Sequence, residues 1–414
     1  MSAIKIVPDG CVTSPEGFLA SGMNAGIKKS FRKLDTALIY SEFPAVSAGT
    51  FTTNNVKAWP LVHDLKVIRN KSHRVIFSNS GNANCFNGRS GEQAVKISLN
   101  LISKKLKVPK KEIFLASTGV IGRVFPVDRI RHAIPELVKH LSKDGGHNAA
   151  RGILTTDTYA KEIAVRFTID KKQVTLAAMA KGAGMVYPEM NASGRKISHH
   201  GTMLCYLTTD LKISKRMLQK ALSDAVDQSF NKIVIDNDQS TNDMVLILAN
   251  GKSGNRRISS LDKRFKLFQD ALAHVCSRIA KDLAKDGEGV THVCEVVVKG
   301  AKTQEEAKRL CDRISTSMLF KTMLAGGDPN WGRIMGSVGA SSVSFSPRLN
   351  IAFDGLPILV NGKEKLKNRN RLRQILKKKE YQLEMNLKSG RFEERYWTTD
   401  LTKFYVWINS TYST

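Results

Sequence analysis

Short apolar runs alternate with amphipathic stretches along this 414-residue chain, and that alternation limits the folds open to it. Val75–Asn79 is an apolar run that leads into a polar segment, as a buried strand does where it ends in a loop. Apolar side chains then recur every three or four positions over about Glu92–Leu106, which is the spacing of an amphipathic helix. Ile113–Ala116 follows as a second strand. This order predicts an α/β protein built in layers.

The same alternation continues in the C-terminal part of the chain. Phe268–Ile279 has helical spacing and ends before the polar turn Asp286–Gly289, after which Val290–Val298 is expected to be a strand. Thr303–Ser315 is predicted to be a helix, because its first residue and Glu306 form a capping box. The C-terminal part is therefore also expected to be α/β.

Bulk properties favour a soluble protein of two or three domains. The chain is 42% hydrophobic, but no apolar stretch approaches the ~18–20 residues of a membrane span. Its first residues lack the apolar core of a signal peptide, so a cytoplasmic protein is expected. The six cysteines are scattered and include no C-x-x-C pair, and the nine histidines show no ligand spacing, which argues against disulfides and against a metal site. The cysteines are Cys11, Cys85, Cys205, Cys276, Cys294 and Cys311.

A net charge of +28 is the bulk feature that points to a different class of protein, since such an excess attracts nucleic acid. The basic residues are nevertheless dispersed, apart from a dense stretch at Lys363–Lys379 that contains no aromatic residue on which bases could stack. We expect no specific nucleic-acid partner and no membrane partner. The same field favours an anionic substrate.

A candidate nucleophile lies near the middle of the chain, in Gly201-Thr202-Met203-Leu204. Self-cleavage of the Gly201–Thr202 bond would free the Thr202 amine, which could act as general base for its own hydroxyl group. Taken alone the pattern is weak, because a Gly-Thr pair at the start of a strand is common. Twenty positions earlier, Lys181 stands beside glycines that allow close backbone approach to a ligand, without the further glycine of a phosphate loop.

Seven further segments, in order, give the chain its resemblance to a known family. They are Phe51-Thr52-Thr53-Asn54, Asn79-Ser80-Gly81-Asn82-Ala83-Asn84, Ser117-Thr118-Gly119-Val120-Ile121-Gly122, Thr155-Thr156-Asp157-Thr158, Ser240-Thr241-Asn242-Asp243, Asp286-Gly287-Glu288-Gly289 and Asp328-Pro329-Asn330-Trp331-Gly332-Arg333. From about Gly22 to Thr414 the chain resembles the ornithine acetyltransferase (glutamate N-acetyltransferase) family of arginine biosynthesis.

That resemblance implies a fold, a reaction and an assembly. The fold would be a layered α/β sandwich of the ornithine acetyltransferase/DmpA-like type, with a main body and a smaller C-terminal α/β lobe. Cleavage would give an α chain of residues 1–201 and a β chain of residues 202–414, assembled as an α2β2 heterotetramer. The enzyme would transfer acetyl from N2-acetylornithine to glutamate through Thr202, without a metal or organic cofactor. Acetyl-CoA is an open second acetyl donor, and an N-terminal-nucleophile aminopeptidase or a basic nucleic-acid-binding protein are the alternatives.

The chain departs from the family pattern just before the nucleophile. The family runs from Pro-x-Met through Ala directly to the threonine, whereas here Pro188-Glu189-Met190 is followed by about ten extra residues, Asn191–Gly201. Ser193 is therefore a rival nucleophile at the family's approximate spacing. Thr202 is preferred because the residues after it match the family. A small residue at 201 also lets the Thr202 hydroxyl approach the preceding carbonyl.

The resemblance assigns roles to further residues. Thr118 and Gly119 would form the oxyanion hole, because a hydroxyl and a backbone N–H can stabilise the charge that develops on an acetyl oxygen. Lys181 would bind a substrate carboxylate and Glu288 the substrate ammonium group. Substrate-binding positions also match Thr155, Asn409 and Thr414. The remaining motif segments are expected to shape the loops around the site.

Overall fold

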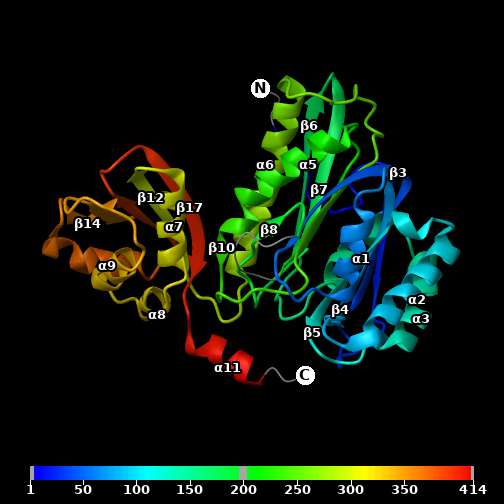
Figure 1. Ribbon diagram of the computed structural model, residues 1–414, viewed down its shortest axis with the longest axis horizontal. Helices are drawn as coiled ribbons and strands as arrows, with labels where there is room; N and C mark the ends of the chain where they lie inside the picture. Colours follow the sequence, from blue (N-terminus) through cyan, green and yellow to red (C-terminus); the bar gives the residue numbers. More distant parts are fainter. Residues whose placement is uncertain (1–3, 195–202, 412–414) are drawn as a thin grey trace. The chain divides into compact units, whose positions relative to one another are not determined.

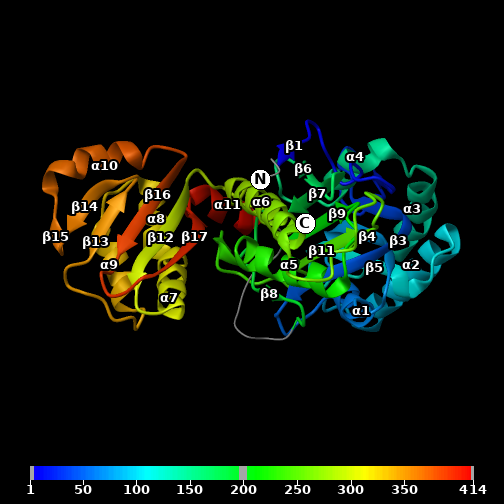
Figure 2. The same ribbon diagram turned by 90° about the horizontal axis from the view of Figure 1, so that it is seen from above.

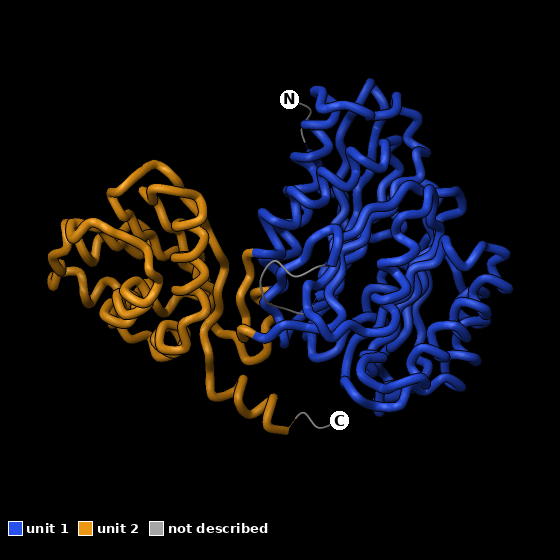
Figure 3. The backbone as a smooth tube through the Cα atoms, in the orientation of Figure 1, with its two compact units in different colours: residues 1–231, 238–283 blue, residues 232–237, 284–414 orange. Residues whose placement is uncertain are grey.

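A computed structural model describes residues 4–194 and 203–411 of the chain. The chain forms two compact units (Figure 3). Unit 1 comprises Met1–Asn231 and Asp238–Leu283, and unit 2 comprises Lys232–Asn237 and Ala284–Thr414. No helix in the described part of the chain is both long and apolar enough to cross a membrane.

Unit 1 is built on a 10-stranded sheet in the order β1-β6-β7-β9-β11-β3-β4-β5, with β2 and β8 also paired to β3. Its strands are β1 Lys5–Ile6, β2 Phe18–Met23, β3 Thr36–Thr52, β4 His73–Asn82, β5 Ile113–Val120, β6 Lys161–Ile169, β7 Lys172–Lys181, β8 Met190–Asn191, β9 Leu204–Thr209 and β11 Met244–Ala249. β3 belongs to both halves of the sheet: its first part pairs with β2 and β4, and its last part pairs with β11.

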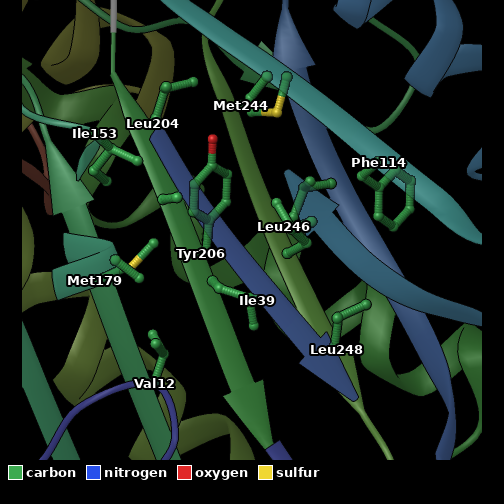
Figure 4. Close-up of a cluster of buried hydrophobic side chains, with 14 of the residues drawn as sticks. Val12, Ile39, Phe114, Ile153, Met179, Leu204, Tyr206, Met244, Leu246 and Leu248 are labelled. Atoms are coloured by element: carbon green, nitrogen blue, oxygen red, sulfur yellow. The ribbon is translucent and has the colours of Figure 1, made fainter. Parts of the chain in front are cut away.

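The main hydrophobic core joins side chains from both halves of this sheet. Tyr206 and Leu246, from β9 and β11, belong to the same buried cluster as Ile39 from β3 and Phe114 from β5 (Figure 4). Leu38, the neighbour of Ile39, belongs instead to a second cluster that includes residues of two helices. Successive side chains of a strand point to opposite faces, so β3 has the main core on one face and helices on the other.

Helices pack on both faces of the sheet. They are α1 Trp59–Val67, α2 Gly88–Leu106, α3 Val127–Lys139, α4 Gly146–Gly152, α5 Lys215–Asp227 and α6 Lys263–Lys285. Of these, α1 and α4 contribute Leu61 and Ala149 to the main core. Short 3₁₀ turns lie at Lys110–Glu112 and Lys143–Gly145. Figures 1 and 2 show α5 and α6 on the side of β7, and α2 and α3 on the side of β4 and β5. Unit 1 is therefore a layered α/β sandwich, as expected.

Unit 2 is a smaller α/β body around a 7-stranded sheet in the order β10-β17-β12-β16-β13-β14-β15. The strands are β10 Ile233–Val234, β12 Val293–Ala301, β13 Asn350–Phe353, β14 Leu356–Val360, β15 Lys363–Glu364, β16 Glu380–Asn386 and β17 Phe392–Thr399. The helices are α7 Gln304–Ser315, α8 Met318–Gly326, α9 Trp331–Gly339, α10 Arg369–Ile375 and α11 Lys403–Thr411, with a short 3₁₀ turn at Leu366–Asn368. A further 3₁₀ turn, Phe230–Lys232, spans the point where the chain passes from unit 1 to unit 2. The predicted smaller C-terminal lobe is confirmed.

Several expected elements are present with shifted ends. β4 and β5 each run several residues further than predicted, so the expected loop at Ser117–Gly122 starts only after Val120. α7 begins at the predicted cap, where the Thr303 hydroxyl accepts from the Glu306 N–H at 3.1 Å. The Glu306 carboxylate, however, accepts from Lys302 N rather than from the cap residue.

The boundary between the two units does not coincide with the expected cleavage point. The chain passes between the units at residues 232–237 and again at 284, whereas the predicted α and β chains meet at residues 201 and 202. A cut there would fall within unit 1. The division into an α chain of residues 1–201 and a β chain of residues 202–414 depends on cleavage of a single peptide bond, and it stays a prediction.

Candidate active site

Thr118 and Gly119 lie near the end of β5, beside the end of β4. The two strands run parallel, with Thr118 opposite Ser80 and Gly119 opposite Gly81. Gly119 has φ +126°, and a Cβ atom at this position would lie 2.5 Å from the Gly81 carbonyl carbon. Only glycine fits this backbone conformation and this close approach. Glycine therefore lets the two strands stay close at the place where Thr118, only 3% exposed, presents its hydroxyl group.

Lys181 meets Thr118 although 63 positions separate them in sequence. Lys181 ends β7 and is 3% exposed, and its Nζ donates to Thr118 Oγ1 at 3.3 Å. β7 pairs antiparallel with β9, with Lys181 opposite Leu204. The ends of β5 and β7 and the start of β9 therefore meet at one edge of the sheet.

Asp157 links the Thr155 segment to this edge. Its carboxylate accepts from Thr155 N at 2.9 Å, from Gly182 N at 2.8 Å and from Lys161 Nζ at 2.6 Å. Burial opposes ionisation of Asp157, but the ammonium groups of Lys181 and Lys161 outweigh it, and the pKa of the carboxyl group falls below its ordinary value. Asp157 thus fixes Thr155 beside the residue that follows Lys181.

Lys28 adds a further positive charge near this site. Its Nζ donates to Leu34 O at 2.7 Å and to Leu154 O at 2.6 Å, the carbonyl just before Thr155. Burial lowers the pKa of Lys28 to about 8, although the Asp35 carboxylate opposes that shift. Lys33 and Lys181 lower the pKa of Lys28 further. An excess of buried or half-buried cations suits a ligand that carries carboxylates.

Met203 is the first described residue after the predicted nucleophile. Its N–H donates to Asp243 Oδ1, and its carbonyl oxygen accepts from Met244 N at 3.0 Å. β9 therefore begins beside the residue just before β11 and beside the end of β7. Gly201 and Thr202, the predicted cleavage point and nucleophile, lie outside the described residues.

Hydrogen bonds from two motif segments, Ser240–Asp243 and Asn79–Asn84, hold the loops of the site in place. Asn242 Nδ2 donates to Ala83 O at 2.8 Å and to Ser117 O at 2.6 Å. Asn79 Oδ1 accepts from the Ser117 hydroxyl at 2.6 Å. These contacts hold the segment before β11 against the ends of β4 and β5. They agree with the architectural role expected of these motifs.

Comparison with known proteins places the chain in a family. The model of the ArgJ family matches residues 19–414. The chain belongs to the ArgJ family.

Two similar proteins match along almost the whole chain, and one chain of a solved structure matches part of it. The glutamate N-acetyltransferase of Methanocaldococcus jannaschii is 42% identical, over 99% of this chain and 100% of that protein. The arginine biosynthesis bifunctional protein ArgJ 1 of Clostridium acetobutylicum is 40% identical over 100% of both chains. A chain in the crystal structure of Mycobacterium tuberculosis ornithine acetyltransferase complexed with ornithine is 33% identical, covering 45% of this chain and 100% of that one, with a TM-score of 0.42. The family resemblance read from the motifs is thereby confirmed.

The ArgJ site residues predicted in the C-terminal part belong to unit 2. Asn409, on α11, donates through Nδ2 to Glu288 Oε2 at 2.9 Å. The turn that carries Glu288 is itself bound by the C-terminal segment, since Thr402 Oγ1 donates to Gly289 O at 2.8 Å. The tail therefore docks through α11, as a binding role for Asn409 requires. Thr414 lies outside the described residues.

Sequence reasoning did not include Lys28 and Asp157 among the residues of this candidate site. Asp157 belongs to a recognised motif segment, but no pattern in the sequence showed that it would lie between two lysines. Ser193, the rival nucleophile, is exposed, and its hydroxyl group donates to Asn191 Oδ1 at 2.8 Å. The structure gives no reason to prefer Ser193 to Thr202 as the nucleophile.

One group of possible metal ligands occurs within residues 4–194 and 203–411. The ligating atoms of Cys11, His147 and Glu162 lie within 4.8 Å of one another. His147 Nδ1 is already 3.1 Å from Glu162 Oε2, so these two side chains pair with each other. The six cysteines are free and buried in the structure. The absence of a metal requirement stays a prediction.

Proposed function

We propose that this protein transfers the acetyl group of N2-acetylornithine to glutamate through an ester on Thr202. The observation that carries the proposal is the meeting of Lys181 Nζ and Thr118 Oγ1, 3.3 Å apart, beside the strand that starts just after Thr202. Relatives that match the whole chain bear the names glutamate N-acetyltransferase and arginine biosynthesis bifunctional protein, which supports the same reaction here.

The first half of the reaction forms the ester. The Thr202 hydroxyl attacks the acetyl carbonyl and passes its proton to the Thr202 amine. The Thr118 hydroxyl and the Gly119 N–H stabilise the oxyanion. The bond between the acetyl carbon and the ornithine nitrogen then breaks, and that nitrogen takes the proton from the amine as ornithine leaves.

The second half repeats these steps in reverse with a different amine. The amino group of glutamate attacks the ester carbonyl and loses a proton to the Thr202 amine, and the proton returns to the Thr202 oxygen as the ester bond breaks. Lys181 binds a substrate carboxylate in both halves, while Thr155, Glu288, Asn409 and Thr414 complete the substrate contacts. No metal or organic cofactor takes part in these steps.

Self-cleavage at Gly201–Thr202 is part of the proposal, because it creates the amine that serves as the base. The resemblance also supports an α2β2 assembly, and the buried free cysteines are compatible with work in the cytoplasm. Acetyl-CoA remains a possible second donor, since relatives of this chain carry both the monofunctional and the bifunctional name.

The deciding experiment incubates purified protein with N2-acetylornithine and glutamate, with and without acetyl-CoA. We expect N-acetylglutamate to form from acetylornithine and glutamate without acetyl-CoA. Double-reciprocal plots of the rate should give parallel lines when glutamate is varied. Incubation with acetylornithine but no glutamate should leave one acetyl group on the fragment that begins at Thr202. N-terminal sequencing of that fragment should read Thr-Met-Leu-Cys. Fully active protein that stays one chain would disprove the free-amine mechanism, and a fragment beginning at Ser193 would move the nucleophile there.

A further inference from the structure

Three side chains of the types that bind transition metals meet in unit 1, and none of them belongs to the candidate active site. The ligating atoms of Cys11, His147 and Glu162 all lie within 4.8 Å of one another. Cys11 lies in the loop between β1 and β2, His147 in α4 and Glu162 in β6. Because the three residues come from distant parts of the chain, no local spacing of cysteines and histidines could reveal them.

The separations of these atoms are close to those of a zinc site. Zn²⁺ binds cysteine sulfur at about 2.3 Å and histidine nitrogen or carboxylate oxygen at about 2.0–2.2 Å, so tetrahedral angles place the ligating atoms roughly 3.3–3.6 Å apart. His147 Nδ1 and Glu162 Oε2 are 3.1 Å apart. Side-chain rotations that move these atoms by roughly 1 Å would therefore bring all three to the distances that Zn²⁺ requires.

The backbone around the ligands is held by contacts of its own. Val7 N donates to Ala164 O at 2.8 Å, which fixes the chain before Cys11 beside β6. The Cys11 loop is closed by Ser14, whose N–H donates to Cys11 O at 2.8 Å and whose hydroxyl accepts from Cys11 N at 3.0 Å. A Cβ atom at position 146 would lie 2.3 Å from Cys11 Sγ, so Gly146 lets the sulfur lie against the start of α4. Metal binding therefore needs no rearrangement of the main chain.

The hydrogen bonds of the three side chains leave them free to bind a metal. The Thr13 hydroxyl donates to Lys143 O at 2.5 Å, so in its 3.0 Å contact with Cys11 Sγ the thiol is the donor. Glu162 Oε1 makes no hydrogen bond with the described residues. On metal binding the thiol proton leaves to solvent, and the neutral imidazole of His147 carries its proton on Nε2 while Nδ1 binds the metal. No electron is transferred.

We propose that Cys11, His147 and Glu162 bind one Zn²⁺ ion, with water as the fourth ligand. Zn²⁺ accepts sulfur, nitrogen and oxygen ligands together, whereas Mg²⁺ and Ca²⁺ favour oxygen alone. The thiolate and the carboxylate cancel the two charges of the ion, which offsets its repulsion by a protein of net charge +28. The ion joins the loop before β2 to α4 and β6, and it takes no part in acetyl transfer.

His140 offers a matched control. It also lies near a glutamate, with Nδ1 3.9 Å from Glu136 Oε2. Within residues 4–194 and 203–411, this pair is not part of a group of three possible ligands. Substitution of His140 therefore reports the weak binding of metal by any exposed histidine, without the thiolate that the proposed site contains.

The test titrates the full chain, freed of affinity tag and of metal, with Co²⁺ and then with Zn²⁺. Co²⁺ occupies zinc sites, and a thiolate bound to it gives a charge-transfer band in the near ultraviolet. We expect one Co²⁺ per chain, displaced by Zn²⁺. Cys11→Ser should lose the band. His147→Asn and Glu162→Gln should each weaken Zn²⁺ binding more than about tenfold, since even outer-shell partners of a metal contribute about 10–100-fold. His140→Asn should bind as wild type does.

Thermal unfolding gives a second measurement. Zn²⁺ should raise the Tm of wild-type protein and not that of Cys11→Ser, because a ligand that binds only the folded state stabilises it. Cys11→Ala, which also removes the sulfur, replaces Cys11→Ser if the serine variant does not fold. Acetyl transfer by wild-type protein should be unchanged after chelation of the metal.

The proposal is overturned if wild-type protein shows no charge-transfer band, or if the band persists without Cys11. An equal loss of Zn²⁺ affinity in His140→Asn would reduce the binding to that of surface histidines. Loss of acetyl transfer on chelation would contradict the placement of the ion outside the reaction. Because metal binding is measured without an activity assay, failure of the proposed function leaves these results independent.

Discussion

At the scale of single residues, the candidate site is a small set of polar and charged side chains that are buried from solvent. Lys181 and Thr118 are each 3% exposed, and Lys161 and Asp157 form an ion pair with 0% side-chain exposure. Burial of a charge is tolerated only where partners replace water. The hydrogen bonds of Asp157 provide those partners, and they also hold the backbone on both sides of the site in place.

Replacing Thr118 with alanine should slow catalysis with little effect on binding. We expect kcat to fall on the order of 10²–10³-fold, the usual effect of removing one donor from an oxyanion hole. KM for acetylornithine should change less, because this interaction strengthens in the transition state. Steady-state kinetics of cleaved protein measures both constants. Thr118→Ser keeps a hydroxyl group and should retain most activity, whereas an unchanged kcat in Thr118→Ala would remove Thr118 from the mechanism.

At the scale of elements, docking of α11 depends on one glycine. Gly289 has φ +68°, and a Cβ atom there would lie 2.5 Å from Tyr405 N, in α11. Gly289→Ala should therefore displace the helix that carries Asn409. Losing a hydrogen bond to a charged group costs about 1.5–3 kcal/mol. We expect KM for acetylornithine to rise by about ten- to a hundredfold, as measured by initial rates.

Gly355→Ala is the matched control for the docking of α11. Gly355 lies in the same unit with a similar φ of +75°, but a Cβ atom there would meet nothing within 4 Å. Gly355→Ala would therefore introduce a similar backbone strain, but without a steric clash of the added Cβ atom. Equal effects of the two substitutions would show that backbone strain, and not displacement of α11, raises KM.

A buried lysine should make unit 2 more stable as pH rises. Burial lowers the pKa of Lys321 to about 7, although Asp236 and Asp400 oppose the shift. Its Nζ donates to Thr399 O at 2.6 Å. An unfolded lysine has a pKa of about 10.4, so between pH ~7 and ~10.4 the unfolded chain binds more protons than the folded one. The free energy of unfolding therefore rises with pH in this window, by up to about 1.4 kcal/mol per pH unit from this residue.

The Lys321 prediction is tested by urea unfolding at pH 7, 8 and 9. Lys321→Met should lose the rise with pH that wild-type protein shows, whatever its overall stability. Taking the difference between the two proteins removes the contributions of the other titrating groups. Equal slopes for both proteins would mean that Lys321 stays charged in the folded state.

The order of elements could be predicted from the sequence, and the contacts of the site could not. Periodicity located α2 and β5, because each repeats apolar side chains over a local stretch. The contact of Lys181 with Thr118 spans 63 positions and depends on which strands pair, which no local pattern encodes. Thr118 was found only through its family motif. Lys28 was missed because a lone lysine has no local signal for burial.

At the scale of the whole molecule, the net charge of +28 should act as a dispersed property of the surface. The lysines of the densest basic stretch, Lys363, Lys365, Lys367, Lys377, Lys378 and Lys379, are exposed. Binding to DNA or RNA should be indifferent to sequence and should largely vanish at physiological salt, because it comes from counterion release. Gel shifts over a salt series measure this. Replacing all six lysines with Gln should leave acetyl transfer intact, and tight sequence-dependent binding at physiological salt would contradict the prediction.

The position of β9 within the sheet has a consequence for the lifetime of the protein. β9 pairs with β7 along Leu176–Lys181, and β11 pairs with β3 along Val46–Phe51. Cleavage at Gly201–Thr202 would leave β7 and β3 on one chain and β9 and β11 on the other. Unfolding would then release two separate molecules, and recovery would become a second-order encounter of fragments. The cut is made once, while the chain is intact, so a denatured enzyme would be replaced by new synthesis more readily than it is repaired.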